Sequence, residues 1–370
     1  MSVRKKPLKS YFIRKADNNF RLEETYLKIY ICADFSQEGI ELLKVAGHEV
    51  KTGGWGFTSK ILEEDELIAD IGDAEVLVVG YETVSKKVLD ETRLRIISSI
   101  RGGPRANIDV DYATSKGIPV FYTFGREALP VADFTMGQLL AITRKLARTD
   151  RELRRGLFTA PDADYGSEGD VIWDMSPEGP WQSRKGIELE GKTLGLIGFG
   201  TVGQQVADRA HAFGMRVVTF DPYQKEEVIK AHHAERADLP TLLSTAHVIS
   251  IHAKVTDQNK GMLGKKEFEM MRDGVYFINN ARAGIVVEEA QREALRSGKL
   301  GGLALDVFHE EPIKENDEYF KYDNVILTPH IAGAGRDVIY LQSVMIANDL
   351  LLYMAGGMPK PVVNPEVFKK

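Results

Sequence analysis

The amino-acid sequence predicts an α/β protein of two domains, each a doubly wound parallel sheet, with a cleft between them. Its 370 residues suffice for two domains, since a domain takes about 150 residues. Runs rich in β-branched residues alternate with segments of helical periodicity, which is typical of parallel sheets covered by helices. A glycine-rich turn between a strand and a helix in the middle of the chain is the third indication.

The composition excludes several classes of protein. The hydrophobic fraction of 43% and the charged fraction of 28% are ordinary for a globular protein. A net charge of −6 without a basic block argues against nucleic acid as a partner. The single cysteine, Cys32, cannot form an intrachain disulfide, which favours the cytoplasm. Because no apolar run approaches the roughly 18–20 residues of a membrane span, no membrane partner is expected. The basic segment Met1–Lys15 lacks an apolar centre and is expected to be a solvated extension.

The first half of the chain contains four predicted strands and two predicted helices. The strands are Leu27–Ala33, Glu49–Lys51, Glu75–Gly80 and Ile96–Ile100, and the first helix is Gln37–Ala46. A long amphipathic helix is expected from Pro130 towards Arg155, with a solvated basic face made of Arg144, Lys145, Arg148, Arg151, Arg154 and Arg155. Residues 156–186 then lose all periodicity, and so long a loop is usually functional.

The second half repeats the pattern without repeating the sequence. The predicted strands are Thr193–Ile197, Arg216–Phe220, Val248–His252, Val275–Asn279, Gly302–Asp306 and Val325–Thr328. A last helix is expected at about Asp337–Ala355.

The glycine-rich turn predicts a dinucleotide site. Gly198 permits the tight turn, Gly200 lets the backbone approach a pyrophosphate, and Gly203 lets the following helix pack closely on the sheet. That helix begins at Thr201 and Val202, whose free N–H groups face the phosphates.

The next strand ends in Asp221, followed by Pro222. A carboxylate at this place accepts hydrogen bonds from the ribose hydroxyls and repels a 2′-phosphate, so the predicted cofactor is NAD rather than NADP. Lys225 lies close enough in sequence to weaken this preference.

Polar residues follow three later strands, where ligands bind in parallel sheets. They form the segments Asn280-Ala-Arg282, Asp306-Val-Phe-x-x-Glu-Pro312 and Thr328-Pro-His-Ile-Ala-Gly333. In this order and spacing, together with the glycine turn, the segments resemble the D-2-hydroxyacid dehydrogenase family, over roughly Leu27 to Asn364. The family includes D-lactate, phosphoglycerate and glycerate dehydrogenases.

The resemblance assigns the catalytic roles to Arg282, Glu311 and His330. Oxidation of a secondary alcohol needs a base for the hydroxyl proton, and an imidazole suits that task near neutral pH. Glu311 would fix the tautomer of His330, and the planar fork of Arg282 would bind the substrate carboxylate and the reacting oxygen. Each could alternatively be a structural histidine or a surface charge.

The resemblance also places four more residues at the cofactor. Asp306 is expected near the nicotinamide carboxamide, with a helix N-cap as the alternative. Ala281, Pro222 and His252 are assigned to the same site. Lys254 stands where the family commonly has proline, so the local turn after His252 is open. No metal site is expected.

The substrate carboxylate is held in this family by backbone N–H groups of a glycine loop. The matching loop contains Gly102 and Gly103, but Pro104 lacks an N–H. Either Arg101 or Arg105 is hypothesised to recognise a second polar or anionic group of the substrate. Of the two, Arg105 is predicted to bind the substrate. Trp55 either lines the substrate side chain or packs within its turn.

The resemblance further implies a discontinuous substrate-binding domain, residues 1–126 with 331–370, and an NAD-binding domain, residues 127–330. The crossover is the segment Phe124–Asp133, and hinge closure of the cleft is expected. A homodimer is expected, and residues 156–186 are predicted to cover the partner or the cleft.

The sequence therefore predicts an NAD-dependent oxidoreductase acting on a small D-2-hydroxyacid or its 2-keto acid, of unspecified identity. One alternative is an NAD(H)-sensing binding protein of the corepressor type on the same scaffold. A formate dehydrogenase is less well supported. The resemblance implies a glutamine as the partner of the histidine in that branch, whereas Glu311 stands at this position here.

Overall fold

The structure is a computed structural model that describes residues 26–159 and 177–369. The chain divides into two compact units, Met1–Arg126 with Arg336–Lys370 and Glu127–Gly335. Residues 331–335, which the sequence analysis assigned to the first domain, belong to the second unit in this division. The extension Met1–Lys15 and residues 160–176 of the aperiodic segment lie outside the described residues.

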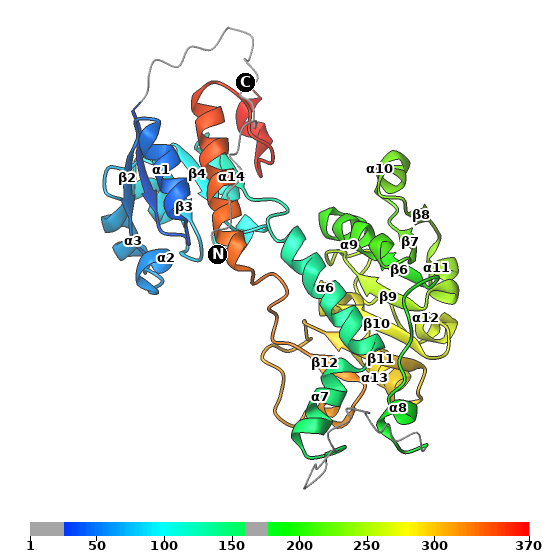
Figure 1. The fold of residues 1–370 in the computed structure, drawn as a ribbon. Helices are drawn as coiled ribbons and strands as arrows, with labels where there is room; N and C mark the ends of the chain where they lie inside the picture. The colour runs from blue at the N-terminus through cyan, green and yellow to red at the C-terminus, as the bar shows by residue number, and fades with distance from the viewer. Residues whose placement is uncertain (1–25, 160–176, 370) are drawn as a thin grey trace. The chain divides into compact units, whose positions relative to one another are not determined.

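The first unit is built on a five-stranded parallel sheet in the order β2-β1-β3-β4-β5 (Figure 1). The strands are β1 (Lys28–Ile31), β2 (Glu49–Thr52), β3 (Val76–Val79), β4 (Ile96–Ser99) and β5 (Val120–Tyr122). The direction of winding reverses between β1 and β3, so the sheet is doubly wound as predicted. Four of these strands match the predicted runs, and β5 was missed.

Helices cover both faces of this sheet. They are α1 (Gln37–Val45), α2 (Trp55–Thr58), α3 (Glu64–Ile71), α4 (Lys86–Glu91), α5 (Val110–Ser115) and α14 (Arg336–Met354), with 3₁₀ turns at Pro104–Ala106 and Pro365–Phe368. The last helix, α14, packs beside α1. The backbone N–H of Ser36 donates to Ser343 Oγ over 2.8 Å, and Gln342 Nε2 donates to the carbonyl of Asp34 over 2.7 Å. These bonds join an N-terminal and a C-terminal segment of the chain within one unit.

The second unit is built on a seven-stranded parallel sheet in the order β12-β11-β10-β9-β6-β7-β8. The strands are β6 (Thr193–Ile197), β7 (Arg216–Phe220), β8 (Glu235–Arg236), β9 (Val248–Ile251), β10 (Val275–Asn279), β11 (Leu300–Leu305) and β12 (Val325–Leu327). Only the short β8 was missed. Winding reverses between β6 and β9, which places the topological switch point beside the end of β6.

Helices cover both faces of this sheet as well. They are α6 (Ala128–Thr143), α7 (Leu146–Arg154), α8 (Pro180–Ser183), α9 (Thr201–Ala212), α10 (Glu226–Ala231), α11 (Leu239–Thr245), α12 (Lys265–Met270) and α13 (Glu288–Arg296), with 3₁₀ turns at Ala283–Ile285 and Glu318–Lys321. Adjacent strand residues point to opposite faces. Ile278 packs with the cluster of α6 and α9, whereas Phe277 packs with that of α11, α12 and α13.

The predicted helix from Pro130 towards Arg155 is wrong as a single element. Helix α6 ends at Thr143 and α7 begins at Leu146, because Lys145 adopts a left-handed conformation with φ +56°. The reason is a later segment that docks on the end of α6. Ile187 N–H donates to the carbonyl of Thr143 over 3.1 Å, and a Cβ on Gly186 would lie 2.2 Å from the same oxygen.

The basic run after α6 is more than a solvated face. The buried carboxylate of Glu152 accepts from Arg148 Nε over 2.8 Å and from Arg184 Nε over 2.6 Å. These bonds lower the pKa of Glu152 although burial opposes its ionisation. Arg151 donates to the carbonyl of Asp323, while Arg154 pairs with Asp150 at the surface. The run therefore ties α7 to the loop before β12.

Within residues 26–159 and 177–369, no helix combines the length and apolar character needed to cross a membrane.

Candidate active site

The glycine turn after β6 has the geometry that its residues predict. Gly198 has φ +95°, and a Cβ there would lie 2.8 Å from the carbonyl carbon of His252. A Cβ on Gly203 would lie 2.5 Å from the carbonyl oxygen of Gly198, so α9 approaches the turn closely. Gly200 is exposed, and a Cβ there would meet no atom within 4 Å. The turn thus leaves open space in front of Gly200.

That space adjoins the first turn of α9. Thr201 and Val202 are half-buried at its start, where the first N–H groups of a helix have no partner inside the helix. Unsatisfied N–H groups and the helix dipole attract phosphate. The turn is therefore suited to a pyrophosphate.

Asp221 lies at the end of β7 and holds the turn itself. Its Oδ2 accepts from the N–H of Phe199 over 2.7 Å, and its Oδ1 accepts from the N–H groups of Tyr223 (2.9 Å) and Gln224 (3.1 Å). Pro222 beside it is exposed. Sequence reasoning missed Arg236 on β8, which donates to the carbonyl of Asp221 over 2.6 Å. Nothing in the local sequence pairs these two residues, because β8 was not predicted.

His252 follows β9 and packs against the glycine turn. Its Nε2 lies 2.9 Å from Ser250 Oγ, and burial lowers its pKa to about 3. The imidazole is therefore neutral near pH 7. Lys254, which stands in place of the expected proline, is exposed, and its carbonyl accepts from Asn259 Nδ2 over 2.8 Å. The departure from the family pattern leaves a hydrogen-bonded turn.

Arg282 is presented by the loop that follows β10. Asn279 is buried, accepts from the N–H of Ala281 over 3.1 Å, and donates to the carbonyl of Arg282 over 3.1 Å. Its amide therefore fixes the backbone on both sides of Ala281. The guanidinium of Arg282 is exposed, with Nη1 2.6 Å from the Ala281 carbonyl. Sequence reasoning gave Asn279 no role, although a polar residue ending a buried strand was a usable signal.

Asp306 ends β11 and is fully buried. Its Oδ1 accepts from Thr328 Oγ1 over 2.6 Å and from the N–H of Ile331 over 2.9 Å, and its Oδ2 accepts from the N–H of Ala332 over 2.8 Å. The alternative interpretation as a helix N-cap is wrong, because no helix follows β11 directly. The carboxylate instead binds the loop that contains His330.

His330 and Glu311 form a hydrogen-bonded pair. His330 Nδ1 lies 2.8 Å from Glu311 Oε2, and Glu311 Oε1 accepts from the N–H of Phe308 over 3.0 Å. The side chain of His330 is 48% exposed and that of Glu311 is 38% exposed, so solvent reaches both. With Nδ1 directed at the carboxylate, Nε2 is the ring atom that can exchange a proton with a ligand.

Electrostatics keep Glu311 ionised. Burial raises its pKa, but the hydrogen bonds from His330 and Phe308 and the charges of His330 and Arg282 outweigh burial, so the net pKa is lowered. The charge of Arg282 makes the smallest of these contributions, although Arg282 comes from the loop after another strand.

The sheet order explains why these groups meet. The glycine turn, the Arg282 loop, the Glu311 loop and the His330 loop follow β6, β10, β11 and β12, all parallel strands of one sheet. Their carboxyl ends therefore share one edge, where ligands bind in open parallel sheets. The predicted residues of the second unit are thus brought to one edge.

The predicted substrate residues lie in the first unit, after β4. Gly102 and Gly103 are exposed, and a Cβ on either would meet no atom within 4 Å. Arg105 Nη1 pairs with Asp111 Oδ1 over 2.7 Å at the surface. Trp55 follows β2 and packs edge-on against Tyr81, with ring centroids 4.5 Å apart.

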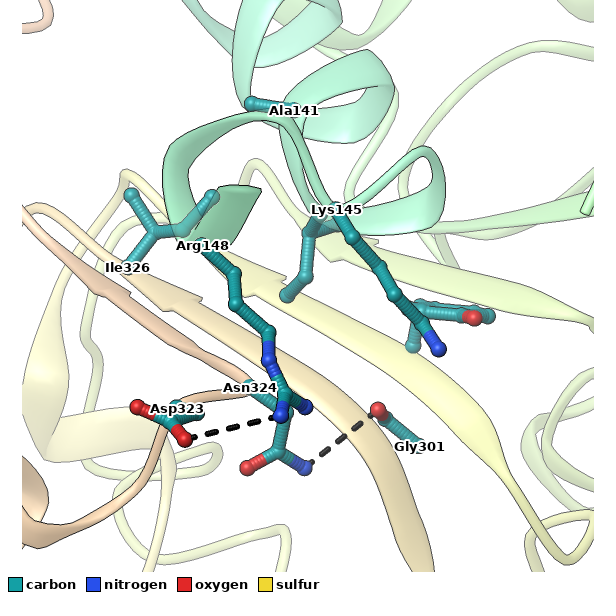
Figure 2. Close-up of a pocket in the computed structure, with 9 residues that line it drawn as sticks. Ala141, Lys145, Arg148, Gly301, Asp323, Asn324 and Ile326 are labelled. Carbon is teal, nitrogen blue, oxygen red and sulfur yellow. Dashed lines mark hydrogen bonds and ion pairs between the residues drawn. The ribbon is translucent and has the colours of Figure 1, made fainter. Parts of the chain in front are cut away.

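The described part of the second unit has a surface hollow of about 340 Å³ that is lined by Lys145, Arg148 and Asp323 with residues at the beginnings of β10 and β11 (Figure 2). It therefore lies at the edge opposite the candidate site. Another hollow, of about 250 Å³, is lined by Asn279, Leu305 and Phe308 among others, at the site's own edge. Among the described residues, no group of three or more His, Cys, Asp or Glu side chains could hold a metal ion.

Several known proteins resemble this chain in sequence. Residues 136–332 match the family described as D-isomer specific 2-hydroxyacid dehydrogenase, NAD binding domain. The chain is 34% identical over 354 residues to D-3-phosphoglycerate dehydrogenase of Archaeoglobus fulgidus, in a match covering 93% of this chain but 61% of that protein. It is 32% identical over 351 residues to glyoxylate reductase of Thermofilum pendens, covering 92% of this chain and 96% of the relative.

A solved structure shares the fold across both units. D-lactate dehydrogenase from Aquifex aeolicus, complexed with NAD and lactic acid, is 28% identical with a TM-score of 0.63, covering 92% of this chain and 97% of that one. Such matches confirm the two doubly wound parallel-sheet units that the sequence predicted. The chain belongs to the D-isomer specific 2-hydroxyacid dehydrogenase family.

Proposed function

We propose that this chain is an NAD-dependent oxidoreductase that interconverts a small D-2-hydroxyacid and its 2-keto acid. The observation that carries the proposal is the His330–Glu311 pair, 2.8 Å apart, at the sheet edge that also presents the glycine turn. A proton-transfer pair beside a dinucleotide cradle is the arrangement that alcohol–ketone chemistry requires.

The cradle fits NAD. The space in front of Gly200 and the first turn of α9 suit a pyrophosphate. Asp221 uses three of the roughly four acceptor positions of a carboxylate on backbone N–H groups, which leaves one for a ribose hydroxyl. Bound NAD would supply or accept the hydride. We assign Pro222, His252, Ala281 and Asp306 to the walls of the same site.

His330 is the proposed acid and base. During reduction its Nε2 donates a proton to the carbonyl oxygen, and during oxidation it accepts the proton of the hydroxyl. Glu311 holds the ring through Nδ1. Proton transfer therefore occurs at a stated atom of a ring whose orientation is fixed.

Arg282 is the proposed substrate-binding cation. Its exposed guanidinium offers two parallel N–H donors, which suit a carboxylate and the reacting oxygen. Asn279 holds the backbone of Arg282 and of Ala281, so the cation is presented from a fixed loop. From the first unit we assign the N–H groups of Gly102 and Gly103 to the substrate carboxylate, with Arg101 or Arg105 beside them.

Three broader assignments complete the proposal. A homodimer is supported by exposed apolar side chains on and after α7, namely Leu146, Leu153, Leu157 and Phe158. A cytoplasmic location is supported by a single cysteine, Cys32, which is buried. The net charge of −6 argues against a nucleic-acid partner.

The test is NADH oxidation by the purified full-length chain with a panel of simple, hydroxylated and phosphorylated 2-keto acids. The matched variant is His330→Asn, because His330 has φ +56° and asparagine tolerates that conformation. We expect an unchanged Tm and a turnover lowered about 10²–10⁴-fold. Binding of NADH without turnover of any 2-keto acid would refute the proposal and favour an NAD(H)-sensing protein.

A further inference from the structure

Three loops of the first unit bring an arginine and two aromatic rings together. Trp55 follows β2, Tyr81 follows β3 and Arg101 follows β4, all at the carboxyl edge of one parallel sheet. The rings of Trp55 and Tyr81 meet edge-on at 4.5 Å, and the guanidinium carbon of Arg101 lies 5.3 Å from the centre of the Tyr81 ring. We call these three side chains the Arg101 cluster.

A buried carboxylate fixes the loops that carry the cluster. Glu82 is fully buried, and its Oε1 accepts from the N–H of Trp55 over 2.8 Å while its Oε2 accepts from the N–H of Tyr81 over 3.3 Å. Asn107 donates to the carbonyls of Gly80 and Glu82 over 3.2 and 2.8 Å. The loops after β2, β3 and β4 are therefore cross-linked behind the cluster, so its rings are held in place.

Arg101 differs from the nearby Arg105 in whether a carboxylate pairs with its guanidinium. Arg105 is paired with Asp111 at the surface, with a side chain 55% exposed. Among the described residues, no carboxylate lies within ion-pair distance of the Arg101 guanidinium, which rests on the face of Tyr81. An aromatic face leaves the edge donors of a guanidinium free for another anion.

Arg101 lies next to the predicted substrate loop in the chain. It directly precedes Gly102 and Gly103, in front of which the structure is open. The cation of the Arg101 cluster and those two N–H groups therefore come from three consecutive residues of one loop.

We propose that Arg101 selects substrates with a second anionic group, a carboxylate or a phosphate ester, at the end away from the 2-keto acid. The inference rests on the proposed function and assigns the hypothesised second contact to Arg101 rather than to Arg105. Tyr81 and Trp55 act as positioning residues, since they fix the plane of the guanidinium without a charge of their own.

The experiment compares substrates that differ only at that end. Wild type, Arg101→Ala, Arg101→Lys and Arg105→Ala are assayed with 2-oxoglutarate against 2-oxopentanoate, and with phosphohydroxypyruvate against hydroxypyruvate. A surface control is Arg95→Ala, since Arg95 is an exposed residue paired with Glu75. The Tm of every variant is recorded to exclude unfolding.

We expect Arg101→Ala to raise KM for the doubly anionic member of a pair about 10–100-fold, because a charge-assisted hydrogen bond is lost. The neutral member should change by less than about threefold. Arg101→Lys should recover part of the loss, because it keeps the charge but not the planar fork.

Three results overturn the inference while leaving the proposed function intact, and the first two concern the variants. They are an equal loss on both members of each pair, and a selective loss confined to Arg105→Ala. A wild type that turns over neutral 2-keto acids but shows no advantage for doubly anionic ones has the same meaning. A wild type that binds NADH but reduces no 2-keto acid, these four included, refutes the proposed function, and the inference with it.

Discussion

The hydroxyl of Thr328 donates a 2.6 Å hydrogen bond to the buried carboxylate of Asp306. Thr328 lies two residues before His330, and the same carboxylate also binds the N–H groups of Ile331 and Ala332 just after it. His330 itself has φ +56°, a conformation that non-glycine residues seldom adopt. Asp306 therefore holds both sides of the residue that the proposed chemistry uses.

Replacement of Asp306 by asparagine should loosen this loop. An amide has one oxygen where the carboxylate has two, so its NH₂ group must face a donor such as the N–H of Ala332. We expect Asp306→Asn to lower the free energy of unfolding by about 1–3 kcal/mol in urea titrations and to lower kcat. Asp273→Asn, at an exposed aspartate paired with Lys299, is the control. Wild-type values for both quantities in Asp306→Asn would contradict this role.

Replacement of Glu311 by glutamine should lower kcat for reduction. The lowered pKa of Glu311 means that it is ionised near pH 7, where its two oxygens accept from His330 and from the N–H of Phe308. An amide has one accepting oxygen, so Glu311→Gln cannot keep both bonds and holds the His330 ring less firmly. We expect kcat for reduction at pH 7, measured as NADH oxidation, to fall about 10–100-fold.

The neighbouring Glu310→Gln provides the matched control, because Glu310 is exposed and pairs with Lys314 over 2.7 Å. Its kcat should equal that of the wild type. A wild-type kcat in Glu311→Gln as well would show that Glu311 does not act on His330.

The glycine turn permits a test that separates folding from cofactor binding. A Cβ on Gly200 meets no protein atom, whereas a Cβ on Gly203 would lie 2.5 Å from the Gly198 carbonyl. Gly200→Ala should thus keep the wild-type Tm and raise Kd for NADH about tenfold or more, while Gly203→Ala should lower Tm as well. Fluorescence titration and thermal unfolding measure the two effects. Wild-type NADH affinity in Gly200→Ala would place the pyrophosphate elsewhere.

Asp349 on α14 should make the stability of the first unit depend on pH. Burial raises its pKa from the ordinary value of 3.8 to about 6. The folded state therefore prefers the protonated form, and the stability this gives is complete below pH 3.8 and is lost as pH rises through 6.

Asp349→Asn should accordingly raise the free energy of unfolding by about 1–2 kcal/mol at pH 8, after allowance for partial exposure. At pH 4 the variant and the wild type should differ little. Urea titrations at the two pH values measure this, and an equal gain at both would mean that the effect is not ionisation.

Much of the fold was predictable because parallel strands carry local signals. Strands β6, β7 and β10 begin and end at the predicted residues, since continuous apolar runs bounded by turn residues mark a strand covered on both faces. The two-residue β8 was not predicted, because Glu235 and Arg236 are exposed and carry no such signal. The helix break at Lys145 was not predicted either. It goes with the docking of Gly186 and Ile187, which lie about forty residues away in the sequence.

The candidate site divides in the same way. The sequence by itself identified the functional groups of the site, because local motifs mark them. These groups are Gly198, Gly200, Gly203, Arg282, Glu311 and His330. Only the tertiary structure decided two of the supports: Asp306 binds the loop that carries His330, and Glu82 joins the loops of Trp55 and Tyr81. The Asp306–Ile331 and Glu82–Trp55 bonds span 25 and 27 residues of sequence, and such partners follow from how strands and loops pack. The bond from Asn279 to Arg282, by contrast, is local. For the same reason the choice between Arg101 and Arg105 depended on the neighbours that the fold gives each of them.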